Sequence, residues 1–326
     1  MSDVAALAGV SSATVSRVLN NNATVDPEYA ERVRAAAEQL GYRPNIVARS
    51  LRKQSGKLIS LIISDVANPF FTSITRGAED VAQRAGYSIL LCNADEDFVK
   101  EATYLSIAEQ QRVAGVILSP HRAGSDVSRL LGENIPIVVV DRPLDEQLDS
   151  VMVNSVGGAK EATNHLLQEG WTRPACITGP EDATTAQQRL QGYLDVIRER
   201  GGEELFTHAP FRQSGGLDAA RELLDLPNPP DAFFIANTQM ALGVLDELLA
   251  RGIRVGVDCG IITFDEAPWS RVIVPPMSVV AQPAYQIGSN AATLLLSRID
   301  GSEGPPVQEV LETELIVRAS SLRDRG

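Results

Sequence analysis

From residue 58 onward, short apolar runs alternate with longer stretches whose apolar residues recur at helical spacing. Seven runs have the length and composition of buried strands, namely Leu58–Ile63, Ser88–Cys92, Gly115–Leu118, Ile135–Val140, Ala175–Thr178, Ala232–Ala236 and Gly260–Phe264. The stretches that predict helices are Phe70–Ala85, Val99–Gln111, Gly157–Glu169, Thr185–Arg200, Gly215–Leu224 and Gln239–Arg251. Strands separated by helices predict an α/β fold of doubly wound parallel sheets, because each parallel strand is reached through a crossover.

Polar and aromatic side chains follow several of the predicted strands. Ligands of doubly wound folds bind beyond the carboxyl ends of the strands, so these side chains are candidate ligand contacts. They are Phe70, Phe71, Ser119, Asp141, Arg189, Asn237 and Asp265. Carboxylates and amides form hydrogen bonds with hydroxyls, and aromatic rings stack on C–H faces, so the set suits a neutral polyol. For any single residue, an ordinary helix cap or a solvated turn is the alternative.

Two short helical patterns at the N-terminus are separated by a turn that contains Gly9. Their apolar faces consist of Val4, Ala5, Leu7 and Ala8 in the first and of Val15, Val18 and Leu19 in the second. Glycine readily adopts the left-handed conformation that ends a helix, and Ser11 or Ser12 could cap the second helix. Two helices joined in this way predict a helix-turn-helix, whose second helix enters the major groove of DNA. A small amphipathic hairpin with a solvated Arg17 is the alternative.

The outer face of the predicted second helix carries small side chains and one long cation. The small side chains, which would let the backbone approach DNA closely, belong to Ser12, Ala13 and Ser16. Arg17 could read guanine through two parallel hydrogen bonds. A third helix is predicted over Pro27–Leu40, with Asp26 at its start and Gly41 after its end. Its apolar side would consist of Val33, Ala36, Ala37 and Leu40.

The charge of the chain is divided unevenly along its length. The net charge of −13 argues at first against a nucleic-acid partner. Residues 1–57, however, hold eight Lys and Arg against five Asp and Glu, a net charge of +3, which leaves −16 for the remainder. A basic head on an acidic body is typical of a protein that touches DNA with one end only.

Several classes of protein are disfavoured by what the sequence lacks. No stretch has the length and apolarity of a membrane span, and the first residues do not form a signal peptide. The three cysteines, Cys92, Cys176 and Cys259, are scattered in or beside apolar runs, as expected for reduced core thiols in the cytoplasm. The three histidines are equally scattered. We therefore expect a cytoplasmic protein with no metal, no cofactor and no membrane partner.

A long ordered set of motifs spans the N-terminal region. It comprises Asp3-Val4-Ala5, Ala8-Gly9-Val10-Ser11, Thr14-Val15-Ser16-Arg17-Val18-Leu19-Asn20, Leu40-Gly41-Tyr42-Arg43-Pro44-Asn45 and Ala48-Arg49-Ser50-Leu51-Arg52. This set resembles the lactose-repressor (LacI-type) family of bacterial transcriptional regulators. The remainder resembles the effector core of that family, which is similar to periplasmic sugar-binding proteins and has two lobes with a ligand cleft between them.

The resemblance implies three parts of the chain. Residues 1–43 would be the helix-turn-helix DNA-binding domain, and residues 44–57 a hinge helix and linker. Residues 58–326 would be the effector-binding and dimerisation core, whose chain crosses between the two lobes near residues 155, 283 and 312. A hinge helix of eight residues is too short to be stable alone, so we expect it to fold only on the operator.

The resemblance also assigns residues to two sites. The DNA-binding residues would be Ser12, Ala13, Thr14, Ser16, Arg17, Asn20, Asn45, Ala48, Leu51 and Arg52. Leu51 matches the family position that wedges into the minor groove and kinks the duplex. The effector-binding residues would be Phe70, Phe71, Ser119, Asp141, Arg189, Asn237 and Asp265, together with Phe211, whose spacing to Ser214-Gly215 departs from the family pattern. The family usually has Asp where this chain has Thr238.

The function implied is that of a non-enzymatic, sequence-specific DNA-binding regulator. We expect a homodimeric repressor on a pseudo-palindromic double-stranded operator, with its affinity changed by a small sugar or nucleoside-like effector. The alternatives are a sugar-binding protein without a regulatory role, and a co-repressor-dependent or activating regulator. An enzyme that uses Asp141 and Asp265 as an acid/base pair is disfavoured, because the sequence has no dinucleotide fingerprint, phosphate loop, nucleophile elbow or metal pair.

Overall fold

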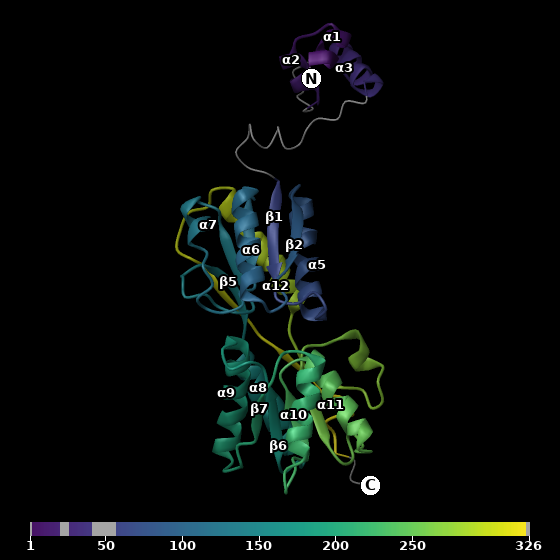
Figure 1. Cartoon of the computed structure of the whole chain (residues 1–326), viewed down its shortest axis with the longest axis vertical. Coiled ribbons are helices and arrows are strands. Elements are labelled where there is room, and N and C mark those ends of the chain that lie inside the picture. The colour runs from purple at the N-terminus through teal and green to yellow at the C-terminus, as the bar shows by residue number, and fades with distance from the viewer. Residues whose placement is uncertain (1, 20–25, 41–56, 324–326) are drawn as a thin grey trace. The chain divides into compact units, whose positions relative to one another are not determined.

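The computed structural model describes residues 2–19, 26–40 and 57–323 of the 326-residue chain. The chain divides into two compact units, residues 1–56 and residues 57–326. The first unit contains the helices α1 (Ser2–Ala8), α2 (Ser12–Leu19) and α3 (Pro27–Gln39) (Figure 1). These three helices confirm the α-helical head predicted from the N-terminal sequence.

The turn between α1 and α2 has the predicted chemistry. Gly9 has a φ of +64°, and a Cβ at this position would lie 2.5 Å from the Arg32 guanidinium. The positive φ favours glycine, because L side chains rarely adopt it, whereas the flexible end of the Arg32 side chain could move away from a Cβ. Of the two candidate capping serines, Ser11 caps α2, and its Oγ accepts a hydrogen bond of 3.1 Å from the Thr14 amide. Asp26 caps α3 by accepting a hydrogen bond of 2.9 Å from the Glu28 amide.

The core of the head is smaller than the sequence predicts. Among the side chains that the structure describes, it consists of Val4, Ala5, Ala8, Val15, Val18, Val33, Ala36 and Ala37; Leu19, also expected in it, lies outside them. Leu7 and Leu40 were expected in it, but they are 49% and 47% exposed. The buried stripe of α1 runs through Val4, Ala5 and Ala8, so Leu7 lies beside it. Leu40 is the C-cap residue, beyond the last turn of α3 that packs on the other helices.

The second unit contains two six-stranded sheets, one in each lobe (Figure 1). In the first lobe the order is β11-β5-β4-β3-β1-β2, with β1 Leu58–Ile63, β2 Ser88–Asn93, β3 Gly115–Leu118, β4 Ile137–Val140, β5 Asp149–Val153 and β11 Gln308–Leu311. In the second the order is β12-β10-β9-β8-β6-β7, with β6 Pro174–Thr178, β7 Phe206–His208, β8 Ala232–Ile235, β9 Gly260–Phe264, β10 Ser278–Ala281 and β12 Glu314–Ile316. All neighbouring strands are parallel except β12, which runs antiparallel to β10.

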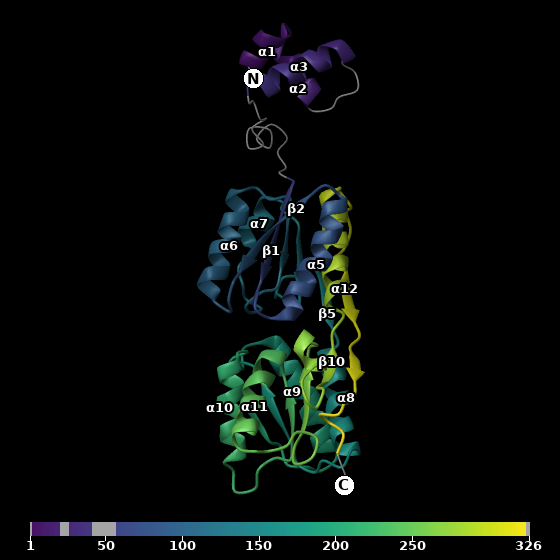
Figure 2. The ribbon, with the colours of Figure 1, turned by 90° about the vertical axis from the view of Figure 1, so that its right-hand side faces the viewer.

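Helices cover both faces of each sheet (Figures 1 and 2). Those of the first lobe are α5 (Pro69–Arg84), α6 (Phe98–Gln110), α7 (Ser128–Gly132) and α12 (Ala284–Ile299). Those of the second lobe are α8 (Ser155–Gln168), α9 (Thr184–Glu199), α10 (Gln213–Leu224), α11 (Thr238–Ala250) and the short 3-10 helix η1 (Pro268–Arg271). Separate apolar clusters lie on the two sides of each sheet, as a doubly wound arrangement requires.

The chain passes between the two lobes three times. It leaves the first lobe between β5 and α8, returns between β10 and α12, and leaves again between β11 and β12. The three crossing segments lie along one side of the molecule (Figure 2). The carboxyl ends of β1 to β4 in the first lobe therefore face the second lobe across a cleft.

All seven predicted strands and all six predicted helices of this unit are present, with boundaries shifted by up to two residues. One prediction about them is wrong, because β2 is an edge strand with exposed residues and not a buried strand. Five strands and two helices were not predicted from the sequence, namely β5, β7, β10, β11, β12, α7 and α12. β7 and β12 have only three residues each, and exposed positions alternate along β11, so these strands have no continuous apolar run.

Candidate functional site

A cavity of about 460 Å³ lies between the two lobes of the second unit. The first lobe lines it with Asp65, Asn68, Phe70, Phe71, Asp95, Glu96, His121, Asp141 and Arg142. The second lobe lines it with Pro180, Asp182, Ala183, Thr185, Arg189, Pro210, Phe211, Arg212, Ser214, Asn237 and Asp265. Most of these residues lie just after the carboxyl end of a parallel strand, where ligands of such folds bind.

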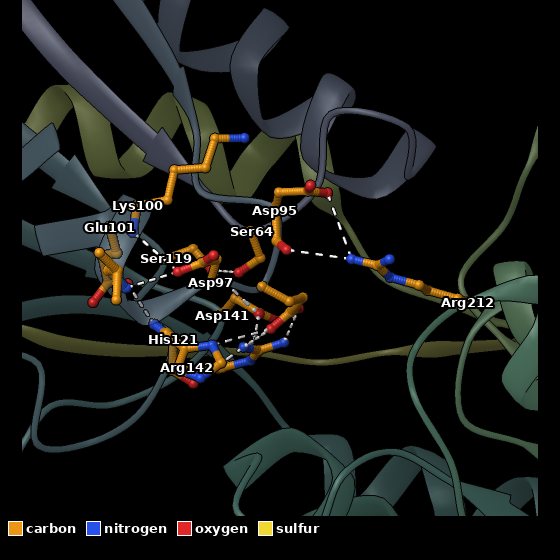
Figure 3. Close-up of polar contacts among 12 residues, drawn as sticks. Ser64, Asp95, Asp97, Lys100, Glu101, Ser119, His121, Asp141, Arg142 and Arg212 are labelled. Carbon is orange, nitrogen blue, oxygen red and sulfur yellow. Dashed lines mark hydrogen bonds and ion pairs between the residues drawn. The ribbon is translucent and has the colours of Figure 1, made fainter. Parts of the chain in front are cut away.

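The structure brings seven of the eight predicted effector residues to this cavity: Phe70, Phe71, Asp141, Arg189, Phe211, Asn237 and Asp265. The eighth, Ser119, does not line it. Ser119 is fully buried, and its Oγ lies 3.4 Å from Oδ2 of Asp141 and 3.2 Å from Oγ of Ser64. The Ser119 side chain therefore contacts Asp141, which lines the cavity, without lining the cavity itself (Figure 3).

Arg189 is a buried cation with a free donor. It is 4% exposed, its Nη1 donates a hydrogen bond of 2.6 Å to the carbonyl oxygen of Ala236, and its guanidinium lies 4.1 Å from the centroid of the Phe264 ring. Burial lowers the pKa of Arg189, and the nearby carboxylates of Asp265 and Asp141 oppose that shift. Its Nε has no hydrogen-bond partner among the described residues. Since Arg189 lines the cavity, its guanidinium is a candidate donor to a hydroxyl of a ligand.

Asp141 and Asp265 approach the cavity from opposite lobes. Burial raises the pKa of both carboxyls, while nearby arginines counteract the shift. The Gln282 amide donates a hydrogen bond to Asp265, which orients that carboxylate. Asn237 caps α11 through its Oδ1, which accepts a hydrogen bond of 2.8 Å from the Met240 amide. Its side-chain NH₂ thus remains as a donor for a ligand.

Aromatic rings complete the wall of the cavity. Phe70 and Phe71 lie in the first turn of α5, and their ring centroids are 5.0 Å apart in an edge-to-face arrangement. Asn68 fixes this turn, because its Oδ1 accepts a hydrogen bond of 3.0 Å from the Phe70 amide. From the second lobe, the Phe211 ring packs so closely on Gly179 that a Cβ there would lie 2.1 Å from a ring atom.

A charged network in the wall of the cavity was not predicted from the sequence. Arg142 donates hydrogen bonds of 2.8 and 2.6 Å to the two carboxylate oxygens of Glu96 and one of 3.3 Å to the carbonyl oxygen of His121. Burial alone would raise the pKa of Glu96, but His121 and Arg142 outweigh it and lower the pKa to about 2. The Glu96 carboxylate in turn raises the pKa of His121. Glu96 and His121 follow β2 and β3, so the rule that selected Asp141 could have found them.

Two polar contacts join the lobes across the cleft. Arg212 reaches from the second lobe to Asp95, with its Nη2 3.8 Å from the carboxylate and 3.5 Å from the carbonyl oxygen (Figure 3). Gln239 at the start of α11 donates a hydrogen bond of 2.9 Å to the carbonyl oxygen of Ala67. The ring of Phe211 also lies 5.7 Å from the guanidinium of Arg142 in the opposite lobe. These contacts form only when the lobes are close together.

The outer face of α2 is the candidate DNA interface. Ala13 and Arg17 are exposed, Thr14 is partly buried, and Val15 and Val18 anchor the helix in the head. Ser12 and Ser16 belong to the same helix. The other predicted DNA contacts, Asn20, Asn45, Ala48, Leu51 and Arg52, lie outside the described residues.

Comparison with known proteins agrees with this division. A family model for bacterial regulatory proteins of the lacI family matches residues 1–45, and a model for the periplasmic binding protein-like domain matches residues 163–321. The ribose operon repressor of Halalkalibacterium halodurans is 35% identical over 323 residues, which cover 98% of this chain and 96% of the repressor. The chain belongs to the lacI family of bacterial regulatory proteins.

Solved structures of related regulators match most or nearly all of the chain. A Lac repressor dimer bound to operator and the anti-inducer ONPF has 26% identity and a TM-score of 0.87, and the match covers 98% of each chain. A complex of the regulator CelR with cellobiose has 34% identity and a TM-score of 0.75 over 98% of each chain. A family member from Enterococcus faecium with bound ribose has 27% identity and a TM-score of 0.74, over 81% of this chain and 98% of that one.

Membership of the lacI family identifies the chain as a DNA-binding transcriptional regulator, and its relatives are transcriptional repressors, which are not enzymes. The fold is the one expected, with a helix-turn-helix head and a core like that of periplasmic binding proteins. No helix among residues 2–19, 26–40 and 57–323 is long and apolar enough to cross a membrane.

Proposed function

We propose that this repressor responds to a neutral sugar of pentose size, or to a nucleoside that contains one, bound in the cavity between the lobes. The observation that carries the proposal is that two buried carboxylates, Asp141 and Asp265, line the cavity together with the buried guanidinium of Arg189 that lies near them. Hydroxyls donate to the carboxylates and accept from the guanidinium. The hydroxyls of a sugar can therefore form the hydrogen bonds that these buried groups would otherwise form with water.

The size and walls of the cavity support a small sugar. A volume of about 460 Å³ holds a monosaccharide with bound water, or a nucleoside. Phe70 and Phe71 on one side and Phe211 on the other offer faces for the C–H groups of a sugar ring. D-ribose is the first candidate, because a relative with 35% identity is a ribose operon repressor and a similar structure contains ribose. The cellobiose complex of CelR makes a disaccharide the second candidate.

We also propose the arrangement on DNA. The helix-turn-helix domain would comprise residues 1–43, with α2 in the major groove and Ser12, Ala13, Thr14, Ser16, Arg17 and Asn20 at the bases and phosphates. The hinge, residues 44–57, would contribute Asn45, Ala48 and Arg52, and Leu51 would insert into the minor groove. As in the Lac repressor dimer on its operator, two copies of this chain would read two half-sites. A repressor acts where the chromosome lies, so the proposed location is the cytoplasm.

The coupling between the two sites would run through closure of the lobes. An effector that contacts both lobes favours the closed form, and the choice between forms would change the distance between the two hinge segments of a dimer. Such coupling is typically about 1–3 kcal/mol, and it is reciprocal. If the open form binds the operator, the effector releases the repressor, which is induction. If the closed form binds it, the effector recruits the repressor, which is co-repression.

The test has two stages. A selection from random duplexes with purified full-length protein should enrich a pseudo-palindrome, which then becomes the operator probe. Isothermal titration calorimetry with D-ribose, adenosine, cytidine and cellobiose should show one-site binding for one of them, and that compound should change operator affinity by roughly 5- to 150-fold. Binding of none of these compounds to a protein that still binds its operator would refute the proposed effector class.

A further inference from the structure

Arg142 is a buried cation that faces the cavity from the first lobe. It is 3% exposed, lines the cavity beside Asp141, and has its Nε 3.5 Å from the Asp141 carboxylate. That Nε has no hydrogen-bond partner in the described part of the chain. A guanidinium at a ligand cavity is well suited to bind a phosphate or carboxylate group. Unless its charge is compensated, Arg142 would therefore attract anionic ligands.

Glu96 supplies that compensation. Its two carboxylate oxygens accept hydrogen bonds of 2.8 and 2.6 Å from Nη1 and Nη2 of Arg142, the paired geometry in which this ion pair is strongest. Glu96 and its neighbour Asp95 both have positive φ, 55° and 58°. Non-glycine residues rarely adopt this conformation, and two in succession indicate that the position of the Glu96 side chain is imposed by the fold.

We propose that Glu96 is a specificity-determining residue: by neutralising Arg142 it makes the cavity select a neutral sugar and reject the phosphorylated form of the same sugar. The inference rests on the proposed function, because it deepens the assignment of the same cavity. With Glu96 in place, a phosphate group would meet the carboxylates of Asp141 and Asp265 without a free cation to offset them. Burial of an uncompensated negative charge costs several kcal/mol in proteins.

Charge balance within the cavity supports this assignment. Its acidic lining residues are Asp65, Asp95, Glu96, Asp141, Asp182 and Asp265, against the three arginines Arg142, Arg189 and Arg212. Arg189 lies near Asp141 and Asp265, and Arg212 lies 3.8 Å from the Asp95 carboxylate. Arg142 has two carboxylates beside it, Asp141 at its Nε and Glu96 at its Nη1 and Nη2, so loss of the Glu96 charge would free the outer nitrogens of a buried cation to pair with an anionic ligand.

The inference places the effector in a reaction sequence. A cavity that binds the free sugar and rejects its phosphate responds to the substrate of a phosphoryl-transfer reaction and not to the product. The repressor would then be released, or recruited, before the sugar is phosphorylated. Accumulation of sugar phosphates from other reactions would not change its state.

The test is calorimetric titration of full-length wild type and Glu96→Gln with D-ribose and with D-ribose 5-phosphate. Glutamine keeps the shape of the side chain and one acceptor oxygen for Arg142, but it removes the negative charge from the two-oxygen pair, which leaves Asp141 as the carboxylate that contacts Arg142. We expect the wild type to bind the phosphate at least about 100-fold more weakly than ribose, and Glu96→Gln to bind it at least about tenfold more tightly than the wild type does. The ribose affinity should change much less.

Asp97→Asn is the matched control. Asp97 lies one residue from Glu96, and its Oδ1 accepts hydrogen bonds from the Val99 and Lys100 amides at the start of α6. Asparagine caps helices equally well, so the variant removes a charge from the same loop without releasing Arg142. It should not improve binding of the phosphate. In the double variant Glu96→Gln/Arg142→Gln, the gained affinity should disappear.

Several results would overturn the inference. Equal affinity of the wild type for ribose and ribose 5-phosphate would do so, even if Glu96→Gln does not fold. So would a folded Glu96→Gln variant that binds ribose but gains no affinity for the phosphate, or an equal gain in Asp97→Asn. If no neutral sugar binds the wild type, the proposed effector class fails. Inorganic phosphate as the titrant then decides the role of Glu96, because Glu96→Gln should still bind it more tightly than the wild type.

Discussion

Asp141 and Asp265 occupy equivalent positions in the two lobes: each directly follows the third strand of its sheet, counted from β11 or β12, and each has a positive φ, 66° and 70°. Aspartate tolerates the left-handed region better than most residues, but the conformation still carries strain. The same unusual turn in both lobes directs one carboxylate into the cavity from each side. A ligand that donates a hydroxyl to both carboxylates therefore joins the two lobes.

Sugar binding should weaken as the pH is lowered, beginning above the pH at which an ordinary aspartate titrates. Burial raises the pKa of both Asp141 and Asp265 above the usual 3.8. A proton on either carboxyl removes an acceptor for a ligand hydroxyl, so protonation competes with binding. Calorimetry with D-ribose between about pH 4 and pH 8 measures the effect. An affinity that stays constant or increases towards acid pH would contradict it.

Two neighbouring groups can be separated from this titration. Glu96, with a pKa of about 2, stays ionised throughout the range, and the Glu96 carboxylate raises the pKa of His121 above the usual 6.5. The pH dependence of the free energy of unfolding has the opposite direction to that of sugar binding. Because the folded pKa values of Asp141 and Asp265 are raised, their contribution to the free energy of unfolding is fully present below pH 3.8 and is lost as the pH rises through the folded pKa.

Replacement of Arg189 by methionine should abolish the response to the effector. The side chain supplies a buried donor near both carboxylates, and its loss also removes the cation nearest to Asp265, whereas Asp141 still has Arg142 beside it. Truncation of one partner in such a buried charged set costs about 2–5 kcal/mol, or roughly 30-fold or more in affinity. The measurement is operator release followed by fluorescence anisotropy during titration with the sugar.

Arg198→Met on the same helix is the control for the Arg189 variant. Arg198 forms an exposed ion pair of 2.7 Å with Glu204, away from the residues that line the cavity. The response to the sugar should survive in this variant. A full response in Arg189→Met would refute the assigned role of Arg189.

The sequence predicts which residues follow a strand, but it does not predict which of their side chains point into the cavity. The position of a residue after a strand was enough to predict Asp141, Asn237 and Asp265 at the cavity, because the ends of parallel strands meet at one edge. The same reasoning placed Ser119 at the cavity, where it is wrong, since the Ser119 side chain points back towards Ser64 and Asp141. Glu96 was missed because its importance comes from a pairing with Arg142, 46 residues away in sequence.

The helices and strands that were not predicted from the sequence also depend on contacts that a local pattern does not show. α12 packs against α5 so closely that a Cβ on Gly288 would lie 1.9 Å from the carbonyl oxygen of Ile74. Its buried side includes small residues such as Ala291 and Ala292, which give a weaker helical pattern than large apolar residues do. β10 and β12 pair with each other although their closest register partners, Ala281 and Glu314, are 33 residues apart in sequence. Local periodicity does not contain that information.

Loss of either interlobe contact should weaken effector binding without changing the effector that is preferred. Arg212→Ala removes an exposed ion pair with Asp95, which is worth about 0.2–1 kcal/mol, so the affinity should fall by less than about sixfold. Gln239→Ala removes the hydrogen bond to the Ala67 carbonyl, which is worth about 0.5–1.5 kcal/mol. Both contacts exist only with the lobes together, so their loss favours the open form. Calorimetry gives the affinities, and small-angle scattering should show a larger radius of gyration without ligand.

Arg17→Ala should weaken operator binding and relax the preference for one base pair in each half-site. Arg17 is exposed on α2, and a bidentate contact from arginine to guanine discriminates by about 1–3 kcal/mol. The measurement is competition between the selected operator and single-base variants at fixed salt. Arg34→Ala removes the same charge from the exposed side of α3 and serves as the control. It should lower affinity for all sequences alike, because a phosphate contact carries no sequence information. If both variants relax the base preference equally, Arg17 does not read a base.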